Sequence, residues 1–460
     1  MKTSLNQPPV RGSSLLITLF ITTIISVMLA SYLTLVRNQN YVTMRSQAWN
    51  SAITVIESGI EEALTHLDRH GTTNLLTDGW TLSGGLYTMI RSIDTSYYVV
   101  TISSDLNPSI VSTGYVPLPS YALANQNSVF AVVGNDSTYT QYYNYTPYVN
   151  RGVRVTTRRN GKFTKAMVAK LTINMNGNNV NSDSFDSSNP SYSSTIGGYP
   201  GQYDITKRRD NGDVASNDTI VNSVNVANAR IRGRVSTGPH GTITIGPNGS
   251  VGNNSWVSGG NNGIQPGYFT DDMNVTFDDV SAPFNGGAFS PGGGDVGGTS
   301  YTYVLGTDNY QMANLSMNGN NKMIVTGNAV LYVTGNTSLS GNAYIKIAPG
   351  ASLTMYVAGS AALGGNGIIN QAQYATNFVY YGLPSNSSLS LRGNGTFKGV
   401  IYAPNAAFTL NGGGSAVEDF IGASVTKTVT FNGHFKFHYD EALIGFGGAG
   451  KYIVTSWNEI

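Results

Sequence analysis

The chain has 460 residues and no cysteine, which excludes disulfides, zinc–thiolate sites and thiol chemistry. Only 11% of its residues are charged, less than half of the roughly 25% found in ordinary soluble domains, so a charge-rich disordered chain and a long soluble coiled coil are excluded. The formal net charge is +1, from 26 basic and 25 acidic residues, so no overall field would gather nucleic acid.

An uncharged, apolar segment covers residues 13–36. Its 24 residues include neither proline nor glycine. A helix of this length, rising about 1.5 Å per residue, would cross a hydrocarbon layer of about 30 Å. We therefore predict a transmembrane helix; a cleaved secretory signal is the alternative, although its apolar region is usually only about 7–15 residues long. Positive charges flank both ends, so the charges alone do not determine the orientation. We place the N-terminus in the cytoplasm because we expect the large polar remainder outside the inner membrane.

The helical pattern continues beyond the apolar segment. Between Tyr41 and Leu67, apolar and small residues recur at steps of three, four or seven, which is the spacing of one helical stripe. No proline occurs between Pro9 and Pro108. We predict one long helix over 13–68, half in lipid and half amphipathic. The acidic residues of the extension are expected on its solvated side: Glu57, Glu61 and Glu62.

The N-terminal region resembles a known family. Gly12 before a small residue, the uncharged segment and the motif VIESGIEEAL are similar to the start of type IV pilins, most closely minor pilins of the PilX type. The resemblance implies that a prepilin peptidase cuts after Gly12, which makes Ser13 the mature N-terminus. The fifth mature position, a glutamate in major pilins, is Ile17 here, which fits a minor subunit or an uncleaved anchor better than a bulk fibre subunit. The resemblance also implies contacts with helices of other pilin-like subunits, through Leu15, Leu16, Ile17 and Phe20.

The rest of the chain has the residue pattern of a β protein. Residues 69–170 contain β-branched and aromatic runs, which predict a small pilin-like sheet on the amphipathic half of the helix. From residue 171 onward, short apolar runs alternate with Gly–Asn corners, and Gly319, Gly327 and Gly335 lie eight residues apart. Each run needs stacked neighbours to bury its apolar face, as in a solenoid with coils of about 24 residues. We predict a right-handed parallel β-helix, with a β-sandwich as the alternative.

The predicted fold class is mainly β with a long N-terminal helix. Phe435, Phe437 and Tyr439 share one strand face, and we expect this strand to cap the open end of the solenoid. The predicted boundaries are a leader at 1–12, the helix at 13–68, the pilin-like region at 69–170, a first solenoid part at 171–270, a crossover linker at 271–300, a second solenoid part with its cap at 301–445, and a tail at 446–460.

Four aspartates fall within nine residues of the crossover linker. Calcium takes about 6–8 oxygen ligands, so the cluster is a candidate calcium site, although its order is not that of an EF-hand loop. A solvated linker is the simpler interpretation. The residues are Asp271, Asp272, Asp278 and Asp279.

Alternating arginines form a second candidate site. Arg230, Arg232 and Arg234 would make a basic ladder on one strand face, which could contact an anionic polymer. Pectin-lyase-like β-helix enzymes use arginine with aspartate and calcium on such a wall, but no paired acidic run lies nearby in this sequence.

A third polar group lies on the expected capping strand. His434, His438 and Asp440 would point away from the aromatic face. Alternate residues on a strand lie about 6.8 Å apart, so the three are too spread to share one zinc ion easily. We interpret them as an outward polar face.

Several segments of the C-terminal part carry a further resemblance. The pieces SDSFDSS at 182–188, DDVSAPF at 278–284, GVIYAPNAAFTLNGGG at 399–414, DFIGAS at 419–424 and FHYDEAL at 437–443 are similar to a poorly characterised domain family found on bacterial pilin-like anchors. That resemblance implies no reaction.

These features predict a location more strongly than a reaction. We expect no enzyme, no cofactor, no resident metal and no nucleic-acid partner. The leading hypothesis is a non-enzymatic, membrane-anchored, pilin-like protein of the inner membrane: a minor subunit or assembly factor of a type IV pilus or related secretion filament, displaying a β-helical surface domain. The alternatives are an anchored module that binds carbohydrate or another surface polymer in adhesion, and a β-helix enzyme that acts on polysaccharide.

Overall fold

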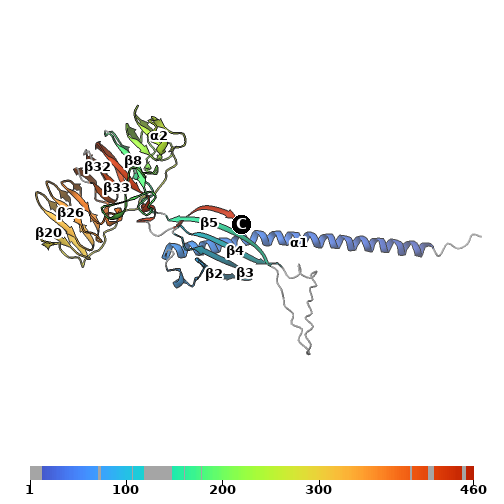
Figure 1. Cartoon of the computed structure of the whole chain (residues 1–460). Helices are drawn as coiled ribbons and strands as arrows, with labels where there is room; N and C mark the ends of the chain where they lie inside the picture. Colours follow the sequence, from blue (N-terminus) through green and yellow to red (C-terminus); the bar gives the residue numbers. More distant parts are fainter. Residues whose placement is uncertain are drawn as a thin grey trace, which may run out of the picture. The chain divides into compact units, whose positions relative to one another are not determined.

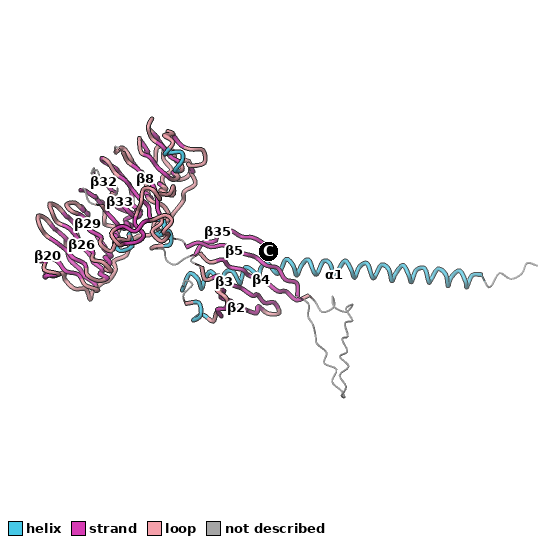
Figure 2. The backbone as a smooth tube through the Cα atoms, viewed as in Figure 1, coloured by secondary structure: helices cyan, strands magenta, loops and turns pink. Residues whose placement is uncertain are grey.

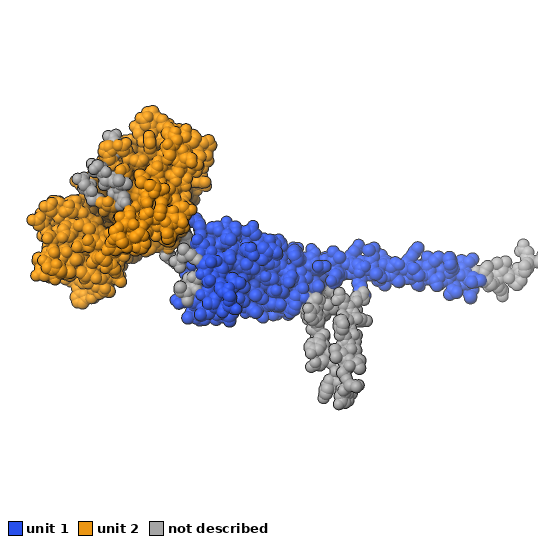
Figure 3. Space-filling model, in the orientation of Figure 1, with its two compact units in different colours: residues 1–159, 450–460 blue, residues 160–449 orange. Residues whose placement is uncertain are grey.

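The computed structural model describes residues 13–70, 74–105, 107–118, 148–159, 161–177, 179–393, 396–412, 419–447 and 452–460. The chain divides into two compact units (Figure 3). The first contains residues 1–159 and 450–460, and the second contains residues 160–449. The second unit is thus inserted in sequence before the last strand of the first, and it begins about ten residues earlier than the predicted boundary at 170.

The first unit is built on one long helix, α1 (Ser13–His70), which confirms the predicted N-terminal helix (Figure 1). The side chains of residues 14–35 are exposed. Every serine and threonine from Thr18 to Thr34 donates its hydroxyl to a carbonyl oxygen three or four residues earlier in the helix. Because these hydroxyls are satisfied within the helix, the exposed half suits a hydrocarbon environment.

The other half of α1 packs on a sheet of six strands, ordered β1-β2-β3-β4-β5-β35 and paired antiparallel throughout. Ala52, Ala63 and Leu67 on the predicted stripe are fully buried, as is the neighbouring Ile56. Gly114 allows the close approach, since a Cβ there would lie 2.8 Å from the Ala52 carbonyl oxygen. The elements are η1 (Leu75–Asp78), β1 (Thr81–Ser83), β2 (Leu86–Ile93), β3 (Ser96–Ser103), β4 (Ser109–Pro117), β5 (Tyr148–Arg159) and β35 (Tyr452–Glu459).

One glutamate of the helix extension does not lie on the solvated side. Glu62 accepts hydrogen bonds from Arg91 Nε and from the Tyr98 hydroxyl, both at 2.6 Å. The prediction for Glu62 was therefore wrong, because it sits at the edge of the buried stripe, where sheet side chains reach it. Glu57 and Glu61 are exposed, as expected.

The last residues of the chain form a strand and not a tail. β35 pairs antiparallel with β5, across about 300 positions of sequence, and Tyr452 is buried in the core of the first unit (Figures 1 and 2). The segment looks like a tail in sequence because most of its side chains are exposed, as befits an edge strand with one partner.

The second unit is dominated by parallel ladders. Strands pair with strands about one coil further along the chain: Leu353 pairs with Phe378, and Val379 with Val400. A large parallel sheet is confirmed, whereas the β-sandwich alternative requires antiparallel sheets. A solenoid is our interpretation of these ladders, and its right-handed winding stays a prediction.

The elements of the second unit fall into two series. Those of the first series are β6 (Met167–Ala169), β7 (Ile173–Asn174), β8 (Asn181–Phe185), β9 (Ser194–Ile196), β10 (Tyr199–Gln202), β11 (Val214–Ser216), β12 (Val224–Ala227), β13 (Arg230–Arg232), β14 (Val235–Ser236), β15 (Ile243–Ile245), β16 (Ser250–Gly252), α2 (Asn254–Ser258), β17 (Gly263–Ile264) and β18 (Phe269–Thr270). Those of the second are β19 (Gly292–Val296), β20 (Thr299–Leu305), β21 (Asn309–Met312), β22 (Leu315–Met317), β23 (Lys322–Val325), β24 (Asn328–Val333), β25 (Thr337–Leu339), β26 (Tyr344–Ile347), β27 (Ser352–Val357), β28 (Ala361–Leu363), β29 (Gly367–Asn370), η3 (Ala375–Asn377), β30 (Phe378–Gly382), β31 (Ser388–Gly393), β32 (Phe397–Gly412), β33 (Phe420–Gly433), β34 (Lys436–Asp440) and η4 (Glu441–Gly445).

The two series meet in the middle of the stack. β8 pairs with β13 on one side and with β34 on the other, and β6 pairs with β11 and with β33. The chain therefore starts in the middle, winds toward α2, crosses to β20 at the opposite end, and winds back to its own first coil (Figure 1). We call the contact between β8 and β34 the coil junction.

The strand expected to cap the solenoid lies at the coil junction instead. β34 has a parallel partner on each side, so it leaves no open edge to cover. Its aromatic residues do face inward: Phe435, Phe437 and Tyr439 are buried in the main core. The alternation of residues predicted the inward face of β34, but the position of β34 along the stack depends on partner strands far away in sequence.

The crossover linker runs along the outside of this stack. Met273 donates its backbone N–H to the Thr237 carbonyl at one end, and Phe289 donates to Asn309 at the other. Between them, the Tyr402 hydroxyl donates to the carbonyl oxygen of Asp278 at 2.9 Å. The segment is thus fixed to rungs of both series.

Candidate functional site

The apolar surface of α1 is the first candidate site. Leu15, Leu16 and Phe20 are each at least 67% exposed, and Ile17 is 56% exposed. In the described part of the chain, α1 is the one helix long and apolar enough to cross a membrane. Ser13 is its first residue, whereas Gly12 lies outside the described residues. These side chains are available to lipid or to other helices.

The three arginines do not form one solvent ladder. β13 ends at Arg232 and the chain turns at Gly233, so Arg234 lies beyond the corner, where its guanidinium sits over the Tyr268 ring. Arg230 is exposed, but Arg232 is only 6% exposed. The expectation of a shared strand face was wrong for Arg234, because a short strand ended sooner than the alternation suggested.

Arg232 is buried beside an acid–histidine pair at the coil junction. His438 Nδ1 lies 2.5 Å from Asp183 Oδ1, and the Tyr203 hydroxyl donates to Asp183 Oδ2 at 2.9 Å. The Tyr203 ring stacks on His438 with centroids 3.8 Å apart. Burial raises the pKa of Tyr203 and lowers the pKa of Arg232. We call Asp183, Tyr203, Arg232 and His438 the junction cluster.

The outward polar face predicted for β34 is therefore largely buried. His438 and Asp440 are each 3% exposed, while His434 is exposed. Asp440 accepts hydrogen bonds from the backbone N–H of Ser187 and of Ala442, and burial raises its pKa. The prediction was wrong because residues far away in sequence, such as Ser187 and Tyr203, cover this face of β34.

The cover over this face is the segment 186–210, which includes the β9–β10 hairpin. Besides Tyr203, it supplies Arg209, whose guanidinium pairs with Glu441 at 2.8 Å. Ser184 and Asn211 also donate to Glu441, at 2.7 and 2.8 Å. Together these contacts tie the end of the last coil to the first coil.

The four aspartates of the crossover are not gathered around one point. Asp279 accepts a hydrogen bond from Asn405 at 2.7 Å, and Asp278 contributes its main-chain oxygen to Tyr402. Asp271 and Asp272 are exposed at the other end of the segment. Among the described residues, no group of three or more His, Asp or Glu side chains could hold a metal ion. The geometry supports a linker that is bonded to the wall.

An open polar groove crosses the coil junction on the outside. Its volume is about 400 Å³, and it is lined by Asn179, Asn228, Arg230, Asn248 and His434. All five residues are exposed. We call this surface the amide groove. Arg230 and His434 were predicted from the sequence as polar site residues, whereas the three asparagines were not, because asparagine is also an ordinary turn residue.

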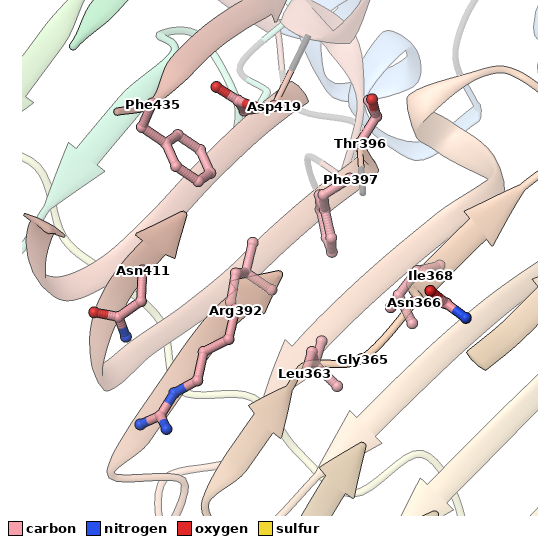
Figure 4. Close-up of a pocket in the computed structure, with 12 residues that line it drawn as sticks. Leu363, Gly365, Asn366, Ile368, Arg392, Thr396, Phe397, Asn411, Asp419 and Phe435 are labelled. Atoms are coloured by element: carbon pink, nitrogen blue, oxygen red, sulfur yellow. The ribbon is translucent and has the colours of Figure 1, made fainter. Parts of the chain in front are cut away.

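A small cavity lies further along the stack and is lined by residues of several coils, among them Leu363, Phe397 and Phe435 (Figure 4). Its volume is about 30 Å³, enough for only one or two water molecules. Asp419 lines it, and burial raises the pKa of this carboxyl, which accepts a hydrogen bond from the Lys436 backbone N–H. The cavity is too small for a substrate.

Comparison with known proteins matches part of the chain to a family model. A family model described as "Domain of unknown function (DUF7305)" matches residues 324–446. The matched segment contains β24 to β34 but not β8, the strand that β34 pairs with at the coil junction. Comparison with curated proteins and with solved structures gave no match.

Proposed function

We propose that the chain is a non-enzymatic, membrane-anchored, pilin-like protein, a minor subunit or assembly factor of a type IV pilus or related secretion filament. The observation that carries the proposal is the division of α1 into an exposed apolar half and a half buried against an antiparallel sheet. Such a helix can hold a precursor in the inner membrane and later pack against the helices of other subunits, with the second unit displayed outside.

A structural role is also favoured by the arrangement of ionisable groups. The junction cluster brings together an aspartate, a histidine and an arginine, the residue types of many active sites, but Tyr203 covers the histidine ring. A polymeric substrate would have to displace a packed segment to reach it. The cluster instead links the first coil to the last, which favours a role in folding.

Processing at Gly12 tests the pilin part of this proposal. We expect that co-expression with an active prepilin peptidase gives a chain that begins at Ser13, as read by mass spectrometry of the purified protein. Substitution of Gly12→Val should preserve the uncut N-terminus without altering α1, which starts after it.

A known prepilin expressed in the same cells serves as the control for peptidase activity. If that control is cut while this chain keeps Met1, the chain is not a prepilin. If it is cut elsewhere than after Gly12, the resemblance that assigns the junction is wrong.

A further inference from the structure

The amide groove is a ladder of equivalent positions from four successive coils. In the parallel register, Lys436 pairs with Asn181, Asn181 with Arg230, and Arg230 with Ser250. The residue two positions before each of these lines the groove: His434, Asn179, Asn228 and Asn248. With strands about 4.8 Å apart, the four rungs span about 14 Å along the stack.

The chemistry of the ladder suits an extended polar ligand. Each asparagine amide offers two donors and an acceptor oxygen, and the described residues that line the groove include no carboxylate and no Phe, Tyr or Trp ring. Arg230 adds a guanidinium that makes no hydrogen bond or ion pair within the described part of the chain, and guanidinium binds carboxylates through two parallel hydrogen bonds. Of the three arginines predicted to contact an anionic polymer, only Arg230 lines this groove.

The corner that carries the ladder is held in an unusual conformation. Ala227, directly before Asn228, has a φ of +48°, a left-handed conformation that alanine rarely adopts. It is fixed by a hydrogen bond from its N–H to Asn225 Oδ1 at 3.1 Å and by one from Gly246 N–H to its carbonyl oxygen at 2.7 Å. Strain of this kind is tolerated where the surroundings fix a site in advance.

The rungs are also joined to each other. The Asn248 backbone N–H donates to Asn228 Oδ1 at 3.2 Å, and Asn179 Nδ2 lies 3.1 Å from His434 Nδ1. The second contact crosses the coil junction, so the groove is complete only when the last coil has closed on the first. A ligand that spans all four rungs would find them preorganised.

We infer that the amide groove binds a linear polysaccharide that carries carboxylate groups, lying along the stack with a carboxylate on Arg230 and hydroxyls on the asparagines. The regular spacing favours a polymer of repeating units over a compact small molecule. Single-stranded nucleic acid binds largely by stacking successive bases on aromatic side chains, and the described lining offers one imidazole and no Phe, Tyr or Trp ring, which argues against that ligand. This inference does not depend on processing or on filament assembly.

The test uses the full chain in detergent and calorimetric titration with a galacturonate oligosaccharide, with a maltose oligosaccharide of equal length as the neutral probe. We expect the uronate to bind and Arg230→Gln to weaken binding at least tenfold. Asn248→Ala, which removes a side chain with no hydrogen bond within the described residues, should weaken it several-fold.

Arg234→Gln is the matched control, since it removes the same charge from an exposed arginine beyond the corner at Gly233. It should leave the affinity within twofold of the unaltered chain. Equal losses for Arg230→Gln and Arg234→Gln, equal binding of the neutral probe, or no binding of the uronate would each overturn the inference. Thermal melts that match the unaltered chain show that the variants are folded.

Discussion

Replacing Phe420 with alanine is expected to lower the free energy of unfolding of the second unit by about 3–5 kcal/mol. Phe420 is fully buried in the main core, in register with Phe397 on one side and Phe437 on the other. The ring centroids are 4.7 Å and 4.2 Å away. Removing the middle ring of this stack loses both contacts and leaves a cavity that close-packed coils cannot fill.

Urea unfolding of the full chain in detergent, monitored by the far-ultraviolet circular dichroism of the β-sheets, measures this loss. Phe289→Ala is the matched control, because Phe289 is 58% exposed on the crossover linker and its loss should cost less than about 1 kcal/mol. Shifts of equal size for the two variants would show that the phenylalanine stack is not a central part of the core.

Replacing Asp183 with alanine should cost a comparable amount, because it leaves the buried His438 ring and Tyr203 hydroxyl without their hydrogen-bond partner, at about 1–3 kcal/mol for each group. His438 and the Tyr203 hydroxyl both bond to this carboxylate, and both lie in a region that water does not reach. The loss should be concentrated at the coil junction, since Asp183 belongs to the first coil and His438 to the last.

Hydrogen exchange can locate this effect. We expect faster exchange in β8 and β34 of the Asp183→Ala variant, with little change in β24 and β27, which lie several rungs away. Asp271→Ala, at an exposed position, is the control and should leave exchange unchanged throughout. Uniformly faster exchange, or none, would contradict the idea that Asp183 fastens the two ends of the second unit.

Sequence patterns predicted what local periodicity determines. The stripe from Tyr41 to Leu67 gave the packing face of α1, and alternation placed Phe435, Phe437 and Tyr439 inward, because both depend on residues a few positions apart. The apolar runs and Gly–Asn corners likewise predicted a mainly β unit with parallel strands.

Local periodicity could not predict features that depend on partners far away in sequence. Asp183 and His438 are 255 positions apart, and β35 pairs with a strand about 300 positions earlier. Arg232 was expected in solvent because its strand was considered without the 186–210 segment that covers it. Two features of the sequence nevertheless point to the junction cluster. Charged residues are scarce in this chain, and Asp183 lies within the motif SDSFDSS.

The central claim is that the exposed half of α1 anchors the chain in a membrane, and flotation with lipid vesicles tests it most directly. We expect the full chain to float with vesicles after washing with high salt and with carbonate, and a chain lacking residues 13–36 to stay at the bottom of the gradient with its two units folded. Recovery of the full chain in the soluble fraction without detergent, or equal flotation of both chains, would contradict it.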